Sequence, residues 1–457
     1  MKKLICSLLA GVMALGMLSG CGGSEEATKD GKAKIMIVSS ERSSQKVMQE
    51  LIDGFNASHP DIEVQYECKD DTVGDYLKTT YTSKNPPDIH ISFSGMDSLR
   101  LAGMIRPLPD DFMEWARENV IKDAIGDPDL DGKYYSIGKS GGAAAKLAYN
   151  KDLFAECGIE APPKTFAEMR EIAKIITEKG NGVKYGFALP LKDAVFTRYY
   201  VMIPGCPSGL MNRDGFDPAT DKFDYSIYGK MVGFLRELIA DGSVFPTPYT
   251  LDNDTARAQF AEGNVGMIYA HGWDVAVYND QFPAKCDWAV VDYPVFDELK
   301  GGHPFGVGGT TGWYMSALSK YPDAQYEVFK WLYSEEVQKR LLETNSISSA
   351  TLKSLADVIT NSEKKNGAEF ATRTYPLFKT DWPKRPSPTI EGDDDYTTLK
   401  NLILDPTLDI DAELSALNDR YNKGYEQFKI DKTELGEDVS QYYKPDVDYI
   451  VDSPEDE

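Results

Sequence analysis

The apolar residues along this chain recur with two periods, and each period predicts a different kind of element. Residues 62–66 alternate between apolar and polar side chains, whereas apolar positions in residues 47–55 recur every three or four residues. A period of two is typical of a half-buried strand, and a period of three to four is typical of a helix. Because the two patterns interleave along the chain, we expect an α/β fold.

The first hundred residues predict an open sheet with ligand-binding loops. Strands are expected over 34–38, 62–66 and 88–92, with a helix over 47–55 between the first two. In open α/β sheets, ligands gather at the loops beyond the carboxyl ends of the strands. The candidate ligand-binding residues in these loops are Ser40, Glu41, Arg42, Ser92 and Ser94.

Residues 147–169 carry the clearest boundary signals. An apolar run ends at Asn150, and Gly158 is expected to stop a short helix. Thr165 and Glu168 then have the spacing of a capping box, which predicts the start of a new helix. The apolar face expected for this helix comprises Phe166, Met169, Ile172, Ala173 and Ile176.

Further elements are expected along the rest of the chain. Strands are predicted over 133–137, 185–189 and 288–293, and one long helix is predicted from Pro322 through Leu342. Residues 127–132 resemble the opening of a calcium-binding EF-hand loop. Glycine stands where the loop needs its bidentate glutamate, so we expect a β-turn instead.

Several motifs resemble the extracellular solute-binding proteins of the maltose-binding protein type. The segment 149–168 reads Tyr-Asn-Lys-Asp-Leu-Phe, then Gly-Ile, then Pro-Pro-Lys-Thr-Phe-x-Glu. Residues 263–267 match the family's Gly-x-x-x-Met strand, and His271-Gly272-Trp273 matches its Gly-x-Trp position. The resemblance covers roughly residues 34–430.

The resemblance implies two lobes of the type II periplasmic-binding-protein fold, each an open sheet flanked by helices, joined by a multi-strand hinge. We expect lobe one to comprise residues 34–142 and 309–370, and lobe two residues 143–308 and 371–430. Residues 431–457 hold ten acidic side chains against two lysines, and we expect a solvated acidic tail there.

The resemblance also implies further ligand contacts. Trp273 is expected to stack on the apolar face of a sugar ring, although a purely structural tryptophan is the alternative. Arg198 stands where related sugar binders can have an aromatic residue, which leaves the class of solute open. The remaining expected contacts are Asp193, Gly309, Thr310 and Tyr396.

The N-terminus has the pattern of a lipoprotein signal peptide. Two lysines precede an uncharged apolar run, and Leu-Ser-Gly-Cys at 18–21 resembles the bacterial lipobox. We therefore expect residues 1–20 to be removed, Cys21 to be lipidated, and residues 21–33 to form a flexible tether. The mature protein would then be anchored on the extracytoplasmic face of the cell membrane.

Charge and motif spacing argue against several other functions. The formal charge of −24 becomes −26 without residues 1–20, so nucleic acid is an unsuitable partner. Scattered histidines and widely spaced cysteines give no metal motif, and neither a metal nor a cofactor is expected. The cysteines after Cys21 are expected to be mostly buried thiols, with one disulfide possible.

Two kinds of hydrolase remain as alternatives to binding. Ser140 satisfies the G-x-S-x-G pattern of a nucleophile elbow, but the resemblance places a strand after it where an elbow needs a helix. A glycosidase would need two carboxylates held at a defined separation, which spacing along the chain does not reveal. We therefore expect no enzymatic activity.

The expected function is a monomeric substrate-binding lipoprotein of an ABC importer. It would capture a carbohydrate between its lobes and deliver it to the permease subunits in the membrane. The alternative is a non-sugar solute such as a polyamine, or a charged sugar derivative, because Arg198 and Glu41 could pair with charged groups.

Overall fold

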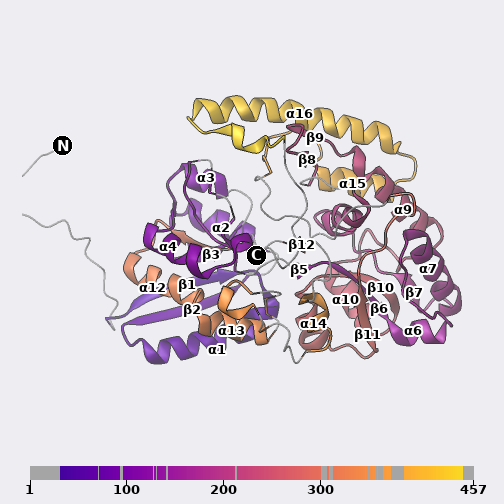
Figure 1. Ribbon diagram of the computed structural model, residues 1–457, viewed down its shortest axis with the longest axis horizontal. Helices are drawn as coiled ribbons and strands as arrows, with labels where there is room; N and C mark the ends of the chain where they lie inside the picture. Colours follow the sequence, from indigo (N-terminus) through magenta and orange to yellow (C-terminus); the bar gives the residue numbers. More distant parts are fainter. Residues whose placement is uncertain are drawn as a thin grey trace, which may run out of the picture.

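The chain forms two α/β lobes, seen side by side in Figure 1. The computed structural model describes residues 31–69, 72–92, 96–126, 128–129, 131–139, 143–210, 214–299, 306–307, 312–344, 346–347, 350–356, 358, 364–371 and 385–445. Each lobe has its own central sheet and its own hydrophobic core. The predicted α/β class and two-lobe architecture are therefore confirmed.

The sheet of lobe one has the strand order β2-β1-β3-β13-β4. Strand β1 pairs in parallel with β2 and β3, whereas β13 runs antiparallel to both β3 and β4. The return of the chain in β13 places a segment from beyond residue 310 in the middle of the first lobe. The strands are β1 (Ala33–Ser39), β2 (Ile62–Cys68), β3 (Ile89–Ile91), β4 (Ile105–Arg106) and β13 (Trp313–Ser316).

The sheet of lobe two has the strand order β11-β6-β10-β7. Its centre is antiparallel, because β6 pairs antiparallel with both β10 and β11. Strand β7 pairs in parallel with β10. The strands are β6 (Lys146–Asn150), β7 (Tyr185–Phe187), β10 (Val265–Ala270) and β11 (Trp288–Val291). Every residue of β10 is buried, so this strand is the core of the lobe.

A short strand pair lies between the lobes. Strand β5 (Ala143–Ala144) pairs antiparallel with β12 (Gly306–Val307), and both are labelled at the centre of Figure 1. The chain passes from one sheet to the other through this pair. It therefore corresponds to the strand connection expected between the lobes.

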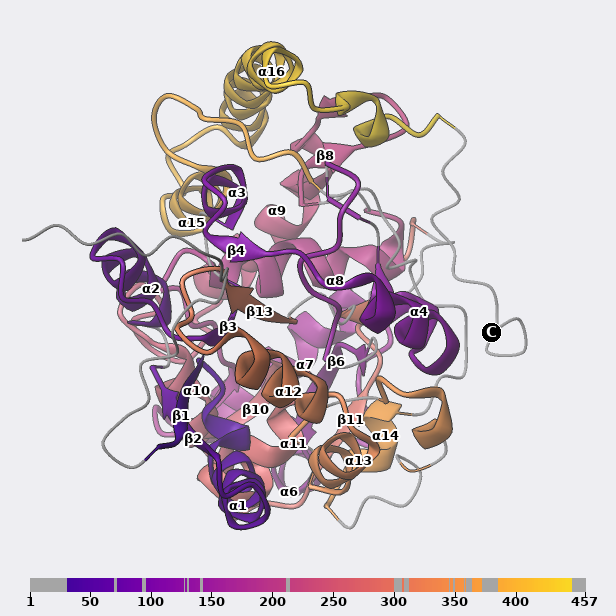
Figure 2. The ribbon, with the colours of Figure 1, turned by 90° about the vertical axis from the view of Figure 1, so that its left-hand side faces the viewer.

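Helices cover both sheets and frame the lobes (Figures 1 and 2). In lobe one they are α1 (Arg42–Ser58), α2 (Val73–Thr82), α3 (Met96–Leu101), α4 (Asp110–Asn119), α5 (Lys122–Ile125), α12 (Pro322–Leu332) and α13 (Glu335–Glu343). Those packed with lobe two include α6 (Lys151–Glu156), α7 (Phe166–Gly180), α8 (Ile203–Gly205), α9 (Gly229–Ala240), α10 (Asn253–Ala261), α11 (Asp274–Ala276), α14 (Gly367–Ala371), α15 (Asp395–Leu404) and α16 (Ile410–Glu434).

Helix α7 begins as the sequence predicted. The Thr165 hydroxyl accepts a hydrogen bond from the Glu168 N–H (3.1 Å), and the Glu168 carboxylate accepts one from the Thr165 N–H (3.3 Å). The predicted apolar face is buried or half-buried against the sheet. A side chain at Gly186 of β7 would stand 2.3 Å from the Cα of Ala173, so the helix rests directly on the sheet.

Two predicted elements differ in the structure. Residues 133–137 are not a strand, because the segment makes single backbone contacts, such as Leu108 N–H to the Tyr134 carbonyl (2.7 Å), without a continuous partner. The expected turn before it is present: the Gly132 N–H donates to the Asp129 carbonyl (2.7 Å). The predicted long helix is divided into two helices, α12 and α13. The backbone is extended at Ser334, between them, and the Ser334 hydroxyl caps α13.

The chain also leaves lobe one earlier than residue 370, the predicted boundary. Phe370 of α14 lies in a core cluster with Phe260 and Trp288 of lobe two. The Asn366 side chain donates to the Trp288 carbonyl (3.1 Å). Residues 364–371 therefore pack with the second lobe.

Residues 431–445, the described part of the predicted acidic tail, are packed against the rest of the protein at three positions. Lys432, Glu437 and Tyr442 are buried. Tyr442 packs against Phe216 and Tyr425 in the core of lobe two, with ring centroids 6.4 Å apart in each case. Net acidity hid this packing, because it gives no information about which individual charges find partners.

Four cysteines lie within the described residues. Cys157, Cys206 and Cys286 are buried and Cys68 is half-buried, as the sequence predicted for most of them. Within the same part of the chain, no helix is both long and apolar enough to cross a membrane. Cys21 lies outside the described residues.

One histidine is fully enclosed by lobe one. His90 of β3 is 0% exposed, its Nδ1–H donates to the Ile91 carbonyl (2.7 Å), and its Nε2 accepts from the Tyr81 hydroxyl (2.7 Å). Burial lowers the pKa of His90 to about 4. The ring is therefore neutral in the folded protein, whereas in the unfolded chain it takes up a proton near its ordinary pKa of about 6.5.

This difference predicts a pH-dependent stability. Between about pH 6.5 and 4 the unfolded chain binds the extra proton, so acidification destabilises the fold, by roughly 1.5 kcal/mol between pH 6.5 and 5. Urea unfolding at several pH values should show this slope, and His90→Gln should reduce it. In the matched variant His59→Gln, which changes a side chain that is 36% exposed, the slope should persist. Equal slopes in the wild type and His90→Gln would contradict the assignment.

Candidate functional site

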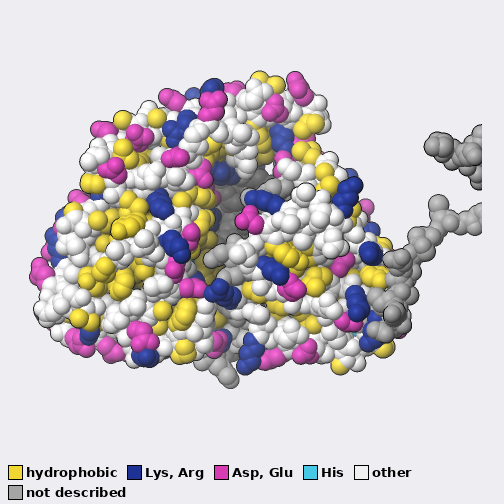
Figure 3. Space-filling view, turned by 180° about the vertical axis from the view of Figure 1, so that it is seen from behind, with side chains coloured by type: hydrophobic (Ala, Val, Ile, Leu, Met, Phe, Trp, Pro, Cys, Tyr) yellow, Lys and Arg dark blue, Asp and Glu magenta, His cyan; other side chains and the backbone are white. Residues whose placement is uncertain are grey.

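The candidate site lies where the loops of lobe one face lobe two. Figure 3 shows a hollow between the two lobes. At one edge of the interface the Arg42 guanidinium, at the start of α1, forms an ion pair with Asp254 at the start of α10 (2.8 Å). The predicted binding loop after β1 therefore contacts the second lobe.

On the side of lobe one, the charge of Glu41 is neutralised within the chain. Glu41 forms an ion pair with Lys139, whose side chain is only 6% exposed. The Lys139 ammonium also lies over the Trp313 ring, 4.7 Å from its centre. Ser40 and Ser92 are half-buried at the ends of the neighbouring strands β1 and β3, so these predicted residues share one edge of the sheet.

On the side of lobe two, three rings form what we call the aromatic wall: Tyr199, His271 and Trp273. His271 and Trp273 are stacked, with centroids 4.4 Å apart and planes 3° from parallel. Tyr199 meets both rings edge-on, at 4.9 Å from His271 and 6.2 Å from Trp273. The half-buried Trp273 is thus held at a fixed angle immediately after β10.

A buried ion pair supports the aromatic wall from behind. Asp274, 2% exposed, accepts a hydrogen bond from the His271 N–H (2.7 Å) and pairs with Arg257 (2.6 Å). Burial alone would raise the pKa of Asp274, but Arg257 and His271 hold it below its usual value. Burial lowers the pKa of His271 despite the nearby carboxylate. The ring that supports Trp273 is therefore neutral at physiological pH.

The same charges connect the aromatic wall to the opposite lobe. Arg257 also pairs with Asp254 (3.4 Å), which is the partner of Arg42 across the interface. A continuous series of ion pairs runs from Arg42 through Asp254 and Arg257 to Asp274. The aromatic wall is therefore close to the place where the two lobes touch.

Arg198 lies beside the wall but is not free. Its Nε donates to both carboxylate oxygens of Asp214 (3.0 and 3.1 Å), and its guanidinium lies 5.8 Å from the centre of the Tyr199 ring. Burial raises the pKa of the half-buried Tyr396, and Asp214 raises it further. The structure thus gathers Arg198, Tyr396 and Trp273 on one side of the interface.

The other predicted contacts have a different status. The Asp193 side chain is exposed, its carbonyl accepts a hydrogen bond from the Phe196 N–H (3.1 Å), and no contact among the described residues joins its carboxylate to the aromatic wall. Four further residues of interest lie outside the described residues: Ser94, Ser140, Gly309 and Thr310.

Sequence reasoning missed several groups that position the side chains of the candidate site. Tyr199 was hidden in an aromatic-rich segment without a periodic signal, and Lys139 has no local signature. A usable signal existed for two acids: Asp254 and Asp274 each stand three residues from the basic side chain they contact, Arg257 and His271 respectively. This spacing favours contact within one helical turn.

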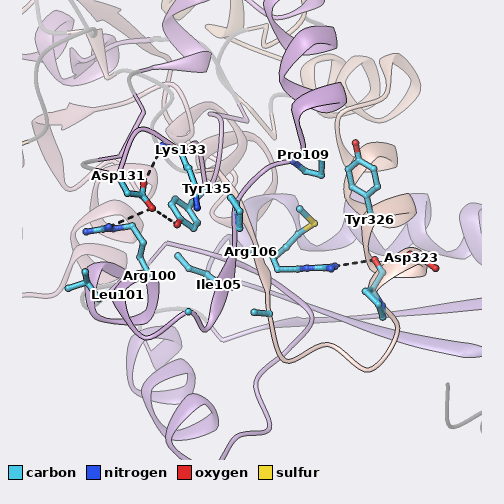
Figure 4. A pocket seen from close by; sticks show the side chains of 15 residues that line it. Arg100, Leu101, Ile105, Arg106, Pro109, Asp131, Lys133, Tyr135, Asp323 and Tyr326 are labelled. Atoms are coloured by element: carbon cyan, nitrogen blue, oxygen red, sulfur yellow. Dashed lines mark hydrogen bonds and ion pairs between the residues drawn. The ribbon is translucent and has the colours of Figure 1, made fainter. Parts of the chain in front are cut away.

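A second hollow, on lobe one, is less suited to a small ligand (Figure 4). Its volume is about 680 Å³, and its walls include Arg100, Arg106 and Asp131. These charges have partners, since Arg100 lies 3.8 Å from Asp131 and Arg106 donates to the Gln325 side chain (3.1 Å). Small-molecule sites combine apolar walls with a few convergent polar groups, and between the lobes the aromatic wall supplies such a surface.

Two α/β lobes that face each other across a hollow, with an aromatic wall on one side, define a bilobal ligand-binding protein. A profile of the family described as "Bacterial extracellular solute-binding protein" matches residues 39–339, which is more than half of the chain. The protein belongs to this family. The predicted family is thereby confirmed.

Curated relatives are similar over most of this chain. The maltotriose-binding protein of Pyrococcus abyssi is 25% identical over 335 residues, covering 70% of this chain and 66% of that protein, just under two thirds of its length. A putative binding protein of Brucella abortus is 24% identical over 342 residues, covering 73% of this chain and 78% of its own.

Solved structures share the fold. The maltose/maltodextrin-binding domain MalE of Bdellovibrio bacteriovorus, bound to maltotriose, superposes with a TM-score of 0.65 at 20% identity, covering 86% of this chain and 100% of that one. An ABC substrate-binding protein from Listeria monocytogenes, in complex with cycloalternan, has a TM-score of 0.66 at 17% identity, covering 86% and 99%.

The buried ion pair behind the wall predicts a large cost when it is broken. Asp274→Asn leaves the Arg257 guanidinium buried beside a neutral amide, and removing one partner of a buried pair typically costs about 3–5 kcal/mol. Urea unfolding at pH 7 measures the loss. Glu262→Gln, which breaks an exposed pair with Lys285, should cost less than about 1 kcal/mol. Comparable losses in the two variants would contradict this account.

Proposed function

We propose that this protein captures a carbohydrate between its two lobes and delivers it to the permease of an ABC importer. Membership of the solute-binding family supports capture of a small solute. The relative from Pyrococcus abyssi is named for maltotriose, and neighbouring structures hold maltotriose, cycloalternan or raffinose. An oligosaccharide is therefore the first solute class to test.

The observation that carries the proposal is the aromatic wall. One face of a pyranose ring presents mainly C–H groups, and an aromatic plate can pack against that face. Trp273 is half-buried, and its position is held from behind by His271 and from the side by Tyr199. A plate held in this way loses little side-chain entropy when a sugar packs on it.

The charged groups of the site favour an uncharged solute over the alternative. A polyamine or a charged sugar derivative would need Glu41 or Arg198 as a counter-ion. Glu41 is paired with Lys139, and Arg198 with Asp214, within the chain. Recruiting either group would break an existing ion pair, whereas sugar hydroxyls can hydrogen-bond to groups that remain paired.

The proposal includes that the protein binds its solute without converting it chemically. The family is described by solute binding, and importers need the solute unchanged. Ser140 keeps the pattern of a nucleophile elbow in the sequence. We expect it to have no role in hydrolysis.

A panel of sugars and charged solutes tests the function. Purified protein is heated with each compound, and a solute at about 100 times its dissociation constant should stabilise the fold by about 2.7 kcal/mol. The bound sugar should be recovered intact after prolonged incubation. Stabilisation only by polyamines or acidic solutes would refute the carbohydrate proposal, and turnover of the sugar would refute the absence of catalysis.

Removing the aromatic plate should weaken binding of the sugar that the panel identifies. Stacking on an aromatic ring is worth roughly 1–3 kcal/mol in nucleic-acid complexes. By analogy, Trp273→Ala should lower the affinity about 5- to 150-fold in calorimetry. Tyr249→Ala, which removes an aromatic side chain in lobe two that is 58% exposed, should leave the affinity unchanged. An unchanged affinity in folded Trp273→Ala would mean that the tryptophan is structural.

We further propose that lipidated Cys21 anchors the protein on the extracytoplasmic face, where a monomer would meet the permease. The lipobox pattern at 18–21 supports this anchor. Membrane fractions should contain the wild-type protein, whereas Cys21→Ala should be released because no acyl chain holds it. Mass spectrometry of the mature N-terminus checks the site, and an unmodified start at any other residue would contradict the proposal.

A further inference from the structure

The C-terminal end of the chain makes a second connection between the lobes, far in sequence from the strand pair β5–β12. Helix α16 extends across the top of both lobes in Figure 1. The Lys432 ammonium pairs with Asp97 of lobe one, and Glu437 pairs with Arg100 of α3 (2.5 Å). We call these four residues the C-terminal clasp.

Three of the four charges in the clasp are buried to an extent that is unusual for surface charges. Relative exposure is 3% for the Arg100 side chain, 6% for Glu437 and 7% for Lys432, whereas Asp97 is 50% exposed. Lys432 and Glu437 also pair with each other (3.1 Å), and Arg100 pairs with Asp97 (2.6 Å). Each cation therefore bridges an acid of lobe one and the acid of the tail.

The clasp is also firmly attached to lobe two. Leu414, Leu417 and Tyr425 of α16 lie in the core of that lobe. Beyond the helix, Tyr442 packs against Phe428 (5.8 Å between ring centroids), and the Lys444 N–H donates to the Pro218 carbonyl (2.9 Å). The two acids and two cations therefore connect one lobe directly to the other.

Burial makes these ion pairs costly to separate. Charges removed from water are destabilised unless their partners stay in place, so breaking a buried pair costs far more than breaking an exposed one. Burial tends to raise the pKa of Asp97, but hydrogen bonds from Lys432 and Arg100 hold it below its usual value. A rotation that moves α3 away from α16 must expose or break this network.

We propose that the C-terminal clasp restrains the angle through which the two lobes can open. The clasp and the Arg42–Asp254 pair are formed in the same structure, so both favour the same relative position of the lobes. Releasing the clasp shifts the population toward more widely separated lobes. Its consequence for solute capture rests on the proposed function, whereas the restraint itself does not.

Small-angle X-ray scattering of the full chain without solute tests the restraint. The double variant Lys432→Met/Glu437→Gln removes one positive and one negative charge, so the net charge of the protein is unchanged. Its distance distribution should shift to longer distances, with a larger radius of gyration than the wild type. The control Lys285→Met/Glu262→Gln removes an exposed pair within lobe two, with exposures of 67% and 49%, and should scatter like the wild type.

Superimposable scattering from the clasp variant and the wild type would overturn the proposal, provided that circular dichroism shows both to be folded. Hydrogen exchange on the unmodified protein gives a second test if the variant does not fold. Amides of α3 should be protected to the same degree as amides in the last turn of α16, because the clasp joins the two helices. Exchange of α3 at the rate of an isolated short helix would also overturn the proposal. Neither test needs a sugar. If the solute panel fails, the scattering and exchange results can therefore still be interpreted.

Discussion

The site depends above all on one buried ion pair, Asp274 with Arg257. A carboxylate that is only 2% exposed is tolerated in a protein interior only when cations and N–H donors surround it. Here the donors are the Arg257 guanidinium and the backbone of His271. Satisfying this one charge fixes the loop after β10, the ring behind Trp273, and the helix that faces lobe one.

Two separate cores explain why the site must lie between them. Each sheet is covered by its own helices, and the clusters of buried residues divide along the same line. A core fills itself with apolar side chains, so polar and aromatic groups available to a solute remain at the facing edges. The short pair β5–β12 and the C-terminal clasp then decide how those edges meet.

The sequence predicted the elements better than the contacts between them. Periodicity and capping signals located β1, β2 and the start of α7, because those signals depend on neighbours within a few residues. The strand predicted over 133–137 does not form, because a strand needs a pairing partner that is distant in the sequence. Trp273 was predicted as a ligand contact from a motif, but Asp214, the partner of Arg198, carries no local signal. The clasp was missed for the same reason, since Asp97 and Lys432 are joined only by folding.

The Arg42–Asp254 contact is a suitable place to measure lobe movement by fluorescence energy transfer. Both side chains are accessible, at 50% and 41% exposure, and they come from opposite lobes. A donor dye at one position and an acceptor at the other would stand close together in the present arrangement and separate as the lobes part. The efficiency of energy transfer would then report lobe closure directly, which would make the protein a ready scaffold for an optical sensor of its solute.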